Sequence, residues 1–284
     1  MPFVPSEPYT VEISRRNPTY LLFLVDQSAS MAENFGTGGH RISKAQGVAD
    51  AVNQLLENLT LKAAKEDGIR DYFYISVIGY GATVGPAFSG DLTGQAMVSL
   101  STVTYAARLI DRTRRVGNGR DAYDEVVKVP VWFDPVSQGS TPMMTAFTVA
   151  GELLEKWLAQ HPDCFPPIVI NITDGEATDG DPVPAATHVK SMASSNGNVL
   201  VFNLHLSSRR DKPVYFPDQE RNLADRFAKG LFAMSSEMPP PIMKTAAALG
   251  YNVAPGSRGF AFNADLVSVV SFLDVGTKRD EMLR

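Results

Sequence analysis

The chain has 284 residues, of which 44% are hydrophobic and 20% are charged, and its formal net charge at neutral pH is -5. This length is enough for one large domain with a sizeable core. The acidic balance gives no support to a nucleic-acid surface, which is normally basic. No apolar stretch approaches the roughly 20 residues that a membrane-spanning helix needs, so we expect a soluble protein with neither nucleic-acid nor membrane partners.

The chain holds a single cysteine, Cys164, which excludes an intramolecular disulfide. No set of cysteine and histidine ligands surrounds it at the spacing of a zinc site. The first apolar run, Tyr20 to Val25, is followed at once by Asp26 and is too short for the core of a signal peptide. We therefore expect a protein of the reducing cytoplasm.

The first 18 residues hold four prolines, which disfavour a regular helix, and we expect them to form an arm lying on the domain. After this arm, the apolar run over residues 20–25 predicts a buried strand. Apolar residues at helical spacing over 42–59 predict an amphipathic helix. The aromatic and β-branched run over 72–80 predicts a second strand.

An irregular segment over residues 88–139 interrupts this alternation of strands and helices. Within it, the run over 126–133 predicts an added edge strand. A second irregular segment, rich in proline, covers about 207–241. Outside these segments helices and strands alternate again. The remaining predicted strands are 168–173, 198–206 and 259–262, and the remaining predicted helices are 145–158, 182–193, 242–249 and 265–273.

Alternating strands and helices imply a mostly parallel sheet covered by helices on both faces. The sequence therefore predicts an α/β fold with a doubly wound sheet. We expect an N-terminal arm over residues 1–18 and one domain over 19–284, with insertions at about 88–139 and 207–241.

Three segments place oxygen-bearing side chains where buried strands or turns end. Asp26, Ser28 and Ser30 directly follow the first strand, Thr141 lies in a Gly-Ser-Thr-Pro turn, and Asp174 lies in a Thr-Asp-Gly turn after the strand over 168–173. In an open parallel sheet, ligands bind beyond the carboxyl ends of the strands, near the point where the strand order reverses. Two carboxylates and three hydroxyls are hard donors, which favour Mg²⁺ or Mn²⁺ over zinc or copper.

Each of these residues also has a structural interpretation. Asp26 can simply turn the chain, Ser28 and Ser30 can cap the next loop, and Thr-Asp-Gly is an ordinary turn signal. Any one of them alone is more readily structural. Their occurrence together, in this order and after these strands, favours a metal site.

The set Asp26, Ser28, Ser30, Thr141 and Asp174 resembles the metal-ion-dependent adhesion site (MIDAS) of the von Willebrand factor type A (VWA) family. The alternation of elements from about Tyr20 to Leu273 is similar too. The resemblance implies a Rossmann-like doubly wound sheet with a divalent cation at its upper edge, usually Mg²⁺, with Mn²⁺ and Ca²⁺ as alternatives. It implies that the hydroxyls coordinate the cation, that Asp26 and Asp174 bind it directly or through water, and that an acidic residue of a partner protein completes the shell.

Without disulfides or a signal peptide, the chain looks more like the bacterial intracellular members of that family than like its adhesion proteins. Those members tend to be adaptors, and some resemble proteins encoded beside tellurium-resistance or stress systems that include a kinase and a phosphatase. By that analogy alone, we expect a cytoplasmic adaptor or regulatory subunit of a stress-response or defence system. The expected partner is a protein, such as a kinase, a phosphatase or a ring ATPase, and we expect no catalysis.

The main rival is a Mg²⁺-dependent phosphoesterase that uses Asp26 as its nucleophile. Such an enzyme usually needs a second carboxylate two residues on and a lysine to hold the phosphate. Ser28 stands at that second position, and the sequence offers no evident phosphate clamp beside the five residues. A serine hydrolase is weaker still, because no Gly-x-Ser-x-Gly elbow occurs, and no P-loop for nucleotides occurs either.

Overall fold

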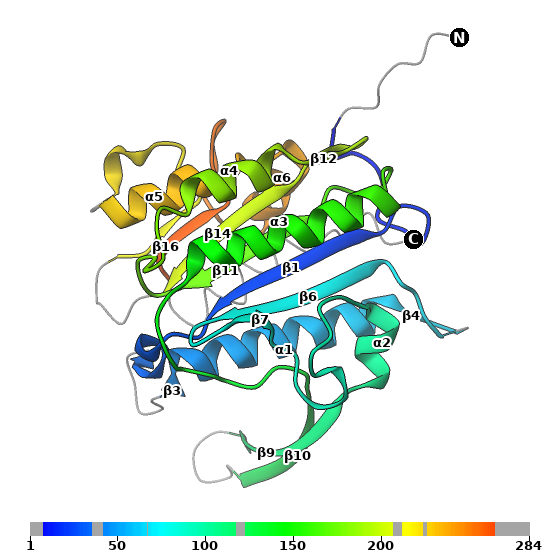
Figure 1. Ribbon diagram of the computed structural model, residues 1–284. Coiled ribbons are helices and arrows are strands. Elements are labelled where there is room, and N and C mark those ends of the chain that lie inside the picture. Colours follow the sequence, from blue (N-terminus) through cyan, green and yellow to red (C-terminus); the bar gives the residue numbers. More distant parts are fainter. Residues whose placement is uncertain are drawn as a thin grey trace.

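The computed structural model describes residues 8–35, 42–66, 68–117, 123–206, 212–223 and 226–264. The helix predicted over 265–273 lies outside these residues. The described chain forms one large sheet with helices packed against it (Figure 1).

Five parallel strands form the centre of this sheet: β1 (Thr19–Asp26), β6 (Phe73–Tyr80), β11 (Ile168–Thr173), β14 (Leu200–Leu206) and β16 (Phe260–Ala264). Three short antiparallel strands extend its edges: β7 (Val84–Pro86), β8 (Val98–Ser99) and β15 (Val214–Tyr215). The order across the sheet is β15, β16, β14, β11, β1, β6, β7, with β8 also paired to β6. The predicted strands at the centre are confirmed.

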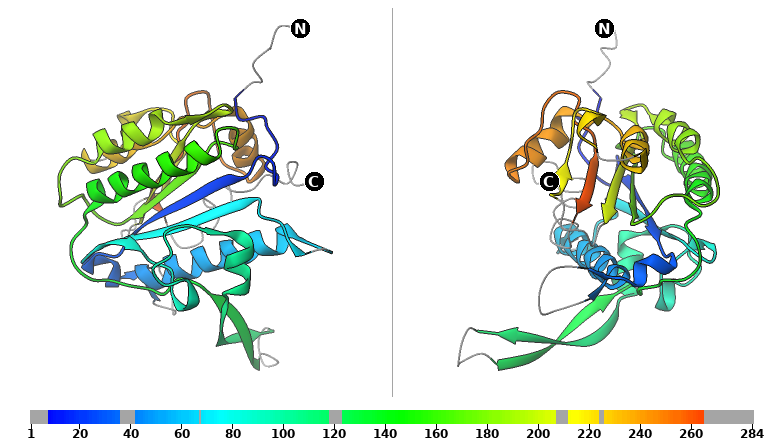
Figure 2. Two further views of the ribbon diagram at one scale, coloured as in Figure 1. Left: turned by 45° about the vertical axis from the view of Figure 1, so that its right-hand side comes forward. Right: turned by 90° about the vertical axis from the view of Figure 1, so that its left-hand side faces the viewer.

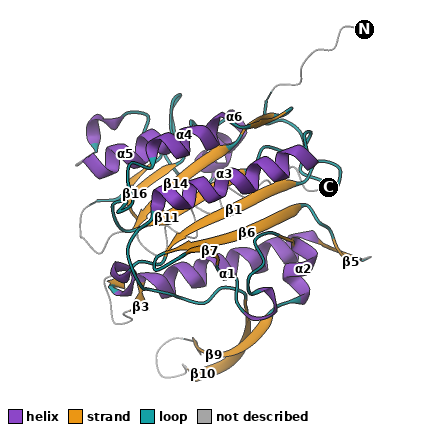
Figure 3. Ribbon diagram, in the orientation of Figure 1, coloured by secondary structure: helices purple, strands orange, loops and turns teal. Residues whose placement is uncertain are grey.

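Helices cover both faces of the sheet (Figures 2 and 3). One face packs against α1 (Lys44–Ala63), α2 (Leu100–Tyr105) and α6 (Pro240–Ala248). The other packs against α3 (Met143–Gln160), α4 (Val183–Ser191) and α5 (Arg226–Met234). The predicted α/β class, a doubly wound and mostly parallel Rossmann-like sheet, is confirmed.

The central strand shows why its sequence reads as a continuous apolar run. Every residue of β1 is buried, and alternate side chains enter opposite cores. Leu21 and Phe23 pack into the core under α1, whereas Leu22 and Leu24 pack into the core under α3. A parallel strand that is covered on both faces needs apolar residues at its odd and at its even positions.

Short hairpins and 3₁₀ turns complete the described structure. The hairpins are β2 (Asn34–Phe35) with β3 (Ile42–Ser43), β4 (Ala64–Lys65) with β5 (Gly68–Ile69), and β12 (Ala193–Ser194) with β13 (Gly197–Asn198). The turns are η1 (Ala29–Ala32), η2 (Gly90–Leu92) and η4 (Glu220–Asn222). The arm residue Tyr9 lies on the last hairpin, where its N–H donates to the Asn196 carbonyl at 2.8 Å and its hydroxyl to the Asn198 carbonyl at 3.1 Å.

The strand order reverses at β1, which lies between β6 and β11. The chain runs from β1 to β6 on one side, and all later parallel strands add on the other side. In the register, Asp26 pairs with Tyr80 and Val25 with Ile172. The carboxyl ends of β1 and β11 therefore meet at the switch point, where a doubly wound sheet binds its ligands.

The segment over 88–139 differs from the prediction of an added edge strand. β9 (Arg108–Val116) and β10 (Tyr123–Val131) pair only with each other and form a two-stranded ribbon that projects from the body (Figures 1 and 2). The run over 126–133 was predicted from its β-branched residues, but a local pattern does not state which strand is the partner. Ion pairs to Asp134 and Asp50 engage Arg108 and Arg112 on this ribbon.

The segment over 207–241 also contributes to the fold. Its strand β15 pairs with β16 at the edge of the sheet, and its helix α5 packs on β14 through Leu231 and Phe232. Within the described part of the chain, no helix combines the length and the apolarity needed to cross a membrane.

A buried asparagine fastens the end of the ribbon to the domain. Asn53 on α1 donates from Nδ2 to the Phe133 carbonyl at 2.9 Å, and its Oδ1 accepts from the backbone N–H groups of Trp132 and Phe133 at 2.9 and 3.1 Å.

We predict that Asn53→Ala lowers the free energy of unfolding by about 2–4 kcal/mol, since it leaves these buried backbone groups without hydrogen-bond partners. Urea denaturation of this variant beside Asn198→Ala, an exposed asparagine, tests it; equal losses would contradict the assignment.

Candidate metal centre

Asp26, at the end of β1, forms the base of the candidate site and is 1% exposed. Its Oδ1 accepts from the Ser28 N–H at 2.8 Å, and its Oδ2 accepts from the Thr173 hydroxyl at 2.7 Å. Burial raises the pKa of the Asp26 carboxyl, and the nearby charge of Asp174 adds to this, while the hydrogen bonds from Ser28 and Thr173 act in the opposite direction. A positive charge here would stabilise the ionised form of this carboxylate.

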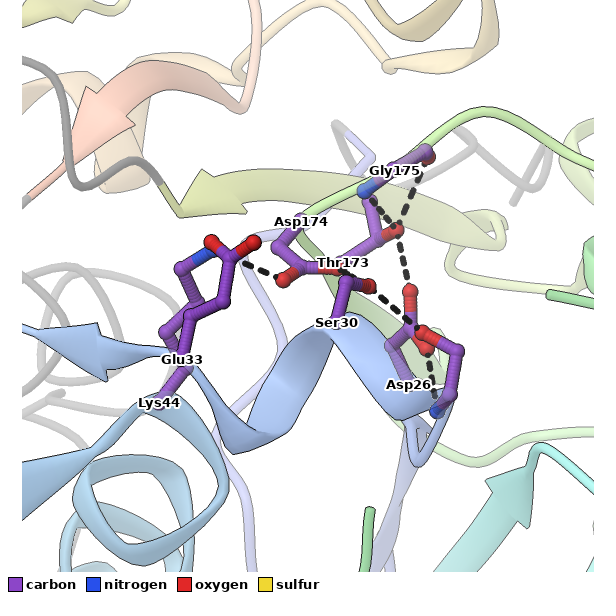
Figure 4. Close-up of polar contacts among 8 residues, drawn as sticks. Asp26, Ser30, Glu33, Lys44, Thr173, Asp174 and Gly175 are labelled. Atoms are coloured by element: carbon purple, nitrogen blue, oxygen red, sulfur yellow. Dashed lines mark hydrogen bonds and ion pairs between the residues drawn. The ribbon is translucent and has the colours of Figure 1, made fainter. Parts of the chain in front are cut away.

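The turn after β1 links Asp26 to the second carboxylate (Figure 4). The turn η1 begins at Ala29 and brings the Ser28 and Ser30 hydroxyls to 3.0 Å from each other. The Ser30 hydroxyl donates to Asp174 Oδ1 at 2.7 Å. Four of the five predicted residues, Asp26, Ser28, Ser30 and Asp174, therefore lie in one connected group.

Thr141, the fifth predicted residue, lies beside the Asp174 turn and is 5% exposed. Its N–H donates to the Thr178 hydroxyl at 3.0 Å, and its carbonyl accepts from the Thr178 N–H at 2.9 Å. A Cβ built on Gly175 would stand 3.8 Å from the Thr141 hydroxyl oxygen. The structure thus brings all three predicted segments to the same edge of the sheet.

Close backbone contacts hold the Thr141 loop against the Asp26 turn. The Gln138 N–H donates to the Gln27 carbonyl at 2.5 Å, and the Ala29 N–H donates to the Gly139 carbonyl at 3.1 Å. Gly139 has φ +83°, and a Cβ on it would meet the Ala82 nitrogen at 2.4 Å. Only glycine fits there, so this residue fixes how near the loop approaches.

Lys44, at the start of α1, completes the site and was not among the predicted residues. Its Nζ donates to Asp174 Oδ2 at 2.9 Å and to Glu33 Oε2 at 2.7 Å (Figure 4). Burial alone would lower the pKa of Lys44, but the hydrogen bonds to Glu33 and Asp174 outweigh it and raise the pKa above its ordinary value. The lysine is therefore charged, and it stands beside the carboxylates, where the sequence offered no evident phosphate clamp.

A signal for Lys44 does exist in the sequence. Ser43 caps α1 by accepting from the Gln46 N–H at 3.1 Å, which makes Lys44 the first helical residue. A cation at a helix N-terminus opposes the helix dipole. Such a residue needs carboxylates nearby, and its position could have pointed to the site.

The charges of the site fit a divalent cation. When all are ionised, Asp26, Asp174 and Glu33 supply three negative charges and Lys44 one positive charge, which leaves a formal charge of -2. Each carboxylate oxygen with one hydrogen bond keeps a second lone pair for a metal. Hydroxyl and carboxylate oxygens suit Mg²⁺, so the donor set fits the cation that the sequence predicts.

The site has few carboxylates for a metal centre. Across the described residues, no group of three or more histidine, cysteine, aspartate or glutamate side chains could hold a metal ion. A cation bound by Asp26 and Asp174 would depend on hydroxyl oxygens for the rest of its protein ligands. The binding of a metal by these residues stays a prediction.

No protein-family model and no curated protein matches this sequence. Similar solved structures include the vWF domain of the type V pili tip protein Mfa5 from Porphyromonas gingivalis, at 13% identity and a TM-score of 0.29 over 59% of this chain and 40% of that chain. The ArnB paralog VWA2 from Sulfolobus acidocaldarius matches at 14% identity and a TM-score of 0.33, over 67% of this chain and 35% of that chain. The pilus adhesin RrgA from Streptococcus pneumoniae matches at 14% identity and a TM-score of 0.31, over 62% of this chain and 22% of that chain.

The chain thus spans well under half the length of these matched chains, between 22% and 40%. The α/β class rests on the sheet order and the helices of this chain itself.

We predict that Gly139→Ala damages the site through the backbone. An alanine at φ +83° is strained, and its Cβ would push the Thr141 loop away from the Asp26 turn. The free energy of unfolding in chelator should fall by about 1–3 kcal/mol, and calorimetric Mg²⁺ affinity should fall with it. Gly85→Ala is the control, because a Cβ there meets nothing within 4 Å; similar behaviour of the two variants would refute the role of Gly139.

We predict that Lys44→Met destabilises the protein in chelator by about 3–5 kcal/mol, since it leaves the buried Asp174 carboxylate without its cation. In excess Mg²⁺ the loss should be smaller, because the metal supplies the missing positive charge, and the affinity for Mg²⁺ should rise. Denaturation with and without Mg²⁺ measures both effects. Lys128→Met, which removes an exposed ion pair to Asp111, should cost at most about 1 kcal/mol and respond equally in both buffers.

Proposed function

We propose that this protein binds a partner protein through a divalent cation, usually Mg²⁺, held at the switch point of its sheet. Asp26, Ser28, Ser30, Thr141 and Asp174 hold the cation from one side. An acidic residue of the partner takes the open coordination position. In this role the chain is a VWA-type domain with a MIDAS and no catalytic activity of its own.

One observation carries the proposal: the two aspartates and two serines from segments far apart in the sequence form a connected group at the sheet edge. Lys44 adds a second reason. Its ion pairs with Asp174 and Glu33 leave the site with a formal charge of -2, which a divalent cation balances while its open coordination position stays available to a partner carboxylate.

The biological setting rests on the resemblance described for the sequence and on nothing in the geometry. In that setting the protein is a cytoplasmic adaptor or regulatory subunit of a bacterial stress-response or defence system. Its partner is a kinase, a phosphatase or an ATPase of the same system.

A second candidate is a Mg²⁺-dependent phosphoesterase with Asp26 as its nucleophile. Lys44 favours it, because a lysine beside the carboxylates is the phosphate clamp that such an enzyme needs. Two facts oppose it: Asp26 is 1% exposed with both oxygens hydrogen-bonded, and Ser28 stands where the acid or base would be. Lys44 is also held by Glu33, which leaves less of its charge for a phosphate.

Asp26→Asn separates these functions. The amide keeps the shape of the carboxylate but removes its charge, so we predict that calorimetric Mg²⁺ affinity falls roughly a hundredfold or more. Because burial already opposes ionisation of Asp26, the stability of the variant in chelator should equal or exceed that of the wild type.

Asp71→Ala is the matched control. Asp71 accepts from the Ser101 N–H and hydroxyl at the opposite end of β6, so its loss should affect stability and leave Mg²⁺ affinity unchanged. Unchanged Mg²⁺ affinity in Asp26→Asn would overturn the proposed metal site. Mg²⁺-dependent hydrolysis of p-nitrophenyl phosphate by the wild type, lost in Asp26→Asn, would establish the phosphoesterase instead.

A further inference from the structure

Glu33 is the charged residue of the candidate metal centre that solvent reaches most easily. Its side chain is 60% exposed, whereas those of Lys44 and Asp174 are 5% and 0% exposed. The Lys44 ammonium lies between the two carboxylates, at 2.7 Å from Glu33 Oε2 and 2.9 Å from Asp174 Oδ2 (Figure 4). The lysine is therefore buried under a carboxylate that itself faces water.

Asp174 shows that one carboxylate can serve the predicted cation site and Lys44 together. Its Oδ1 accepts from the Ser30 hydroxyl at 2.7 Å, and its Oδ2 accepts from Lys44 at 2.9 Å. Ser30 is a predicted ligand of the cation, so a single carboxylate group separates the lysine from that ligand. A carboxylate that arrives from outside also has two oxygens, one for the cation and one for the lysine.

The two ion pairs of Lys44 differ in how easily they can be broken. Asp174 is fully buried, and a buried carboxylate that loses its counter-charge is strongly destabilising. The Glu33 carboxylate is mostly in water, where exposed ion pairs contribute little to stability and the released carboxylate is solvated. Glu33 is therefore the one that another carboxylate can replace.

Glu33 can leave the lysine by a rotation of its side chain alone. Its backbone N–H donates to the Ser30 carbonyl at 3.0 Å, and its carbonyl accepts from the Lys44 N–H at 2.9 Å. Neither of these bonds involves the carboxylate. The turn η1 and the start of α1 can therefore keep their places while the Glu33 side chain moves.

The charge balance selects a carboxylate as the group that replaces Glu33. With Glu33 in place, the charge of -2 on the site is brought to zero by a divalent cation. Without the Glu33 carboxylate, the same site keeps one positive charge. One carboxylate of a partner neutralises that charge, whereas a phosphate monoester, with a charge of about -1.5 to -2, exceeds it.

We propose that Glu33 holds, in the unbound protein, the place that the partner's acidic residue takes on binding. The incoming carboxylate displaces Glu33 from Lys44 and contacts the lysine with one oxygen and the cation with the other. This inference rests on the proposed function. It adds that Lys44 recognises the partner directly and that Glu33 competes with the partner for Lys44.

The probe is a peptide from a phage-displayed library of random sequences, selected on the full chain in Mg²⁺ and eluted with chelator. It must contain an acidic residue and must fail to bind Asp26→Asn. Its Kd for each variant is measured by fluorescence polarisation in saturating Mg²⁺. Calorimetric Mg²⁺ titration of each variant gives the Mg²⁺ affinity and the concentration that saturates the site.

Glu33→Gln keeps the size of the side chain and removes the competing charge. We expect it to bind the probe roughly fivefold more tightly than the wild type, because less of the protein is held in the competing state. Its Mg²⁺ affinity should fall, since the site loses a negative charge. Glu155→Gln is the matched control: Glu155 is 64% exposed and pairs with His188 on α4, so both affinities should stay unchanged.

Lys44→Met should shift both affinities in the opposite directions. Its Mg²⁺ affinity should rise, because the site loses a positive charge. Its affinity for the probe in saturating Mg²⁺ should fall roughly tenfold or more, because the peptide carboxylate loses a hydrogen bond from a charged group. A lysine that acts only on the cation would raise the Mg²⁺ affinity and leave the probe affinity unchanged.

The outcomes separate the two proposals. If Glu33→Gln binds the probe no more tightly than the wild type, or if Lys44→Met binds it as tightly, the exchange is overturned and metal-dependent binding stands. If Lys44→Met does not fold, Glu33→Gln alone decides. If no acidic peptide both elutes with chelator and depends on Asp26, the proposed function fails and the exchange fails with it.

Discussion

The close approach of two buried carboxylates at the sheet edge is the constraint on which the rest of the site depends. Asp26 and Asp174 follow neighbouring parallel strands at the switch point, so the topology itself brings them together. Burial raises the pKa of Asp26 and the charge of Asp174 adds to this, so a positive charge at this edge would stabilise the ionised carboxylate. Lys44 supplies part of it from the start of α1, which explains why a cation stands at the unfavourable end of a helix.

A row of buried polar groups lies under this edge and connects the end of α5 to the sheet. The Tyr80 hydroxyl donates to Asn171 Oδ1 at 2.7 Å, Asn171 Nδ2 donates to Asn203 Oδ1 at 2.9 Å, and Asn203 Nδ2 donates to the Ser235 hydroxyl at 3.0 Å. Apolar packing alone allows a helix to slide, whereas a fully bonded buried row has one arrangement. The end of α5 is thereby fixed relative to the strand that carries Asp26.

Local patterns were enough to predict the centre of the fold and the meeting of the three site segments. Buried parallel strands such as β1 carry apolar residues at every position, and a polar residue directly after one must emerge at the carboxyl edge. The separate ribbon of β9 and β10 could not be predicted in this way, because a local pattern does not state which strand is the partner. Lys44 was missed for a similar reason, since its carboxylate partners lie 11 and 130 residues away.

The same contacts bear on the choice between binding and catalysis. A nucleophilic carboxylate must face its substrate, whereas Asp26 is 1% exposed and each of its oxygens accepts one hydrogen bond, from Ser28 or from Thr173. Those bonds hold the carboxylate in a single orientation, which suits a fixed ligand and hinders an attacking group. Lys44 is held between Asp174 and Glu33 at distances below 3 Å, so its charge serves the carboxylates first. These contacts are the reason why we propose a binding role in preference to the phosphoesterase.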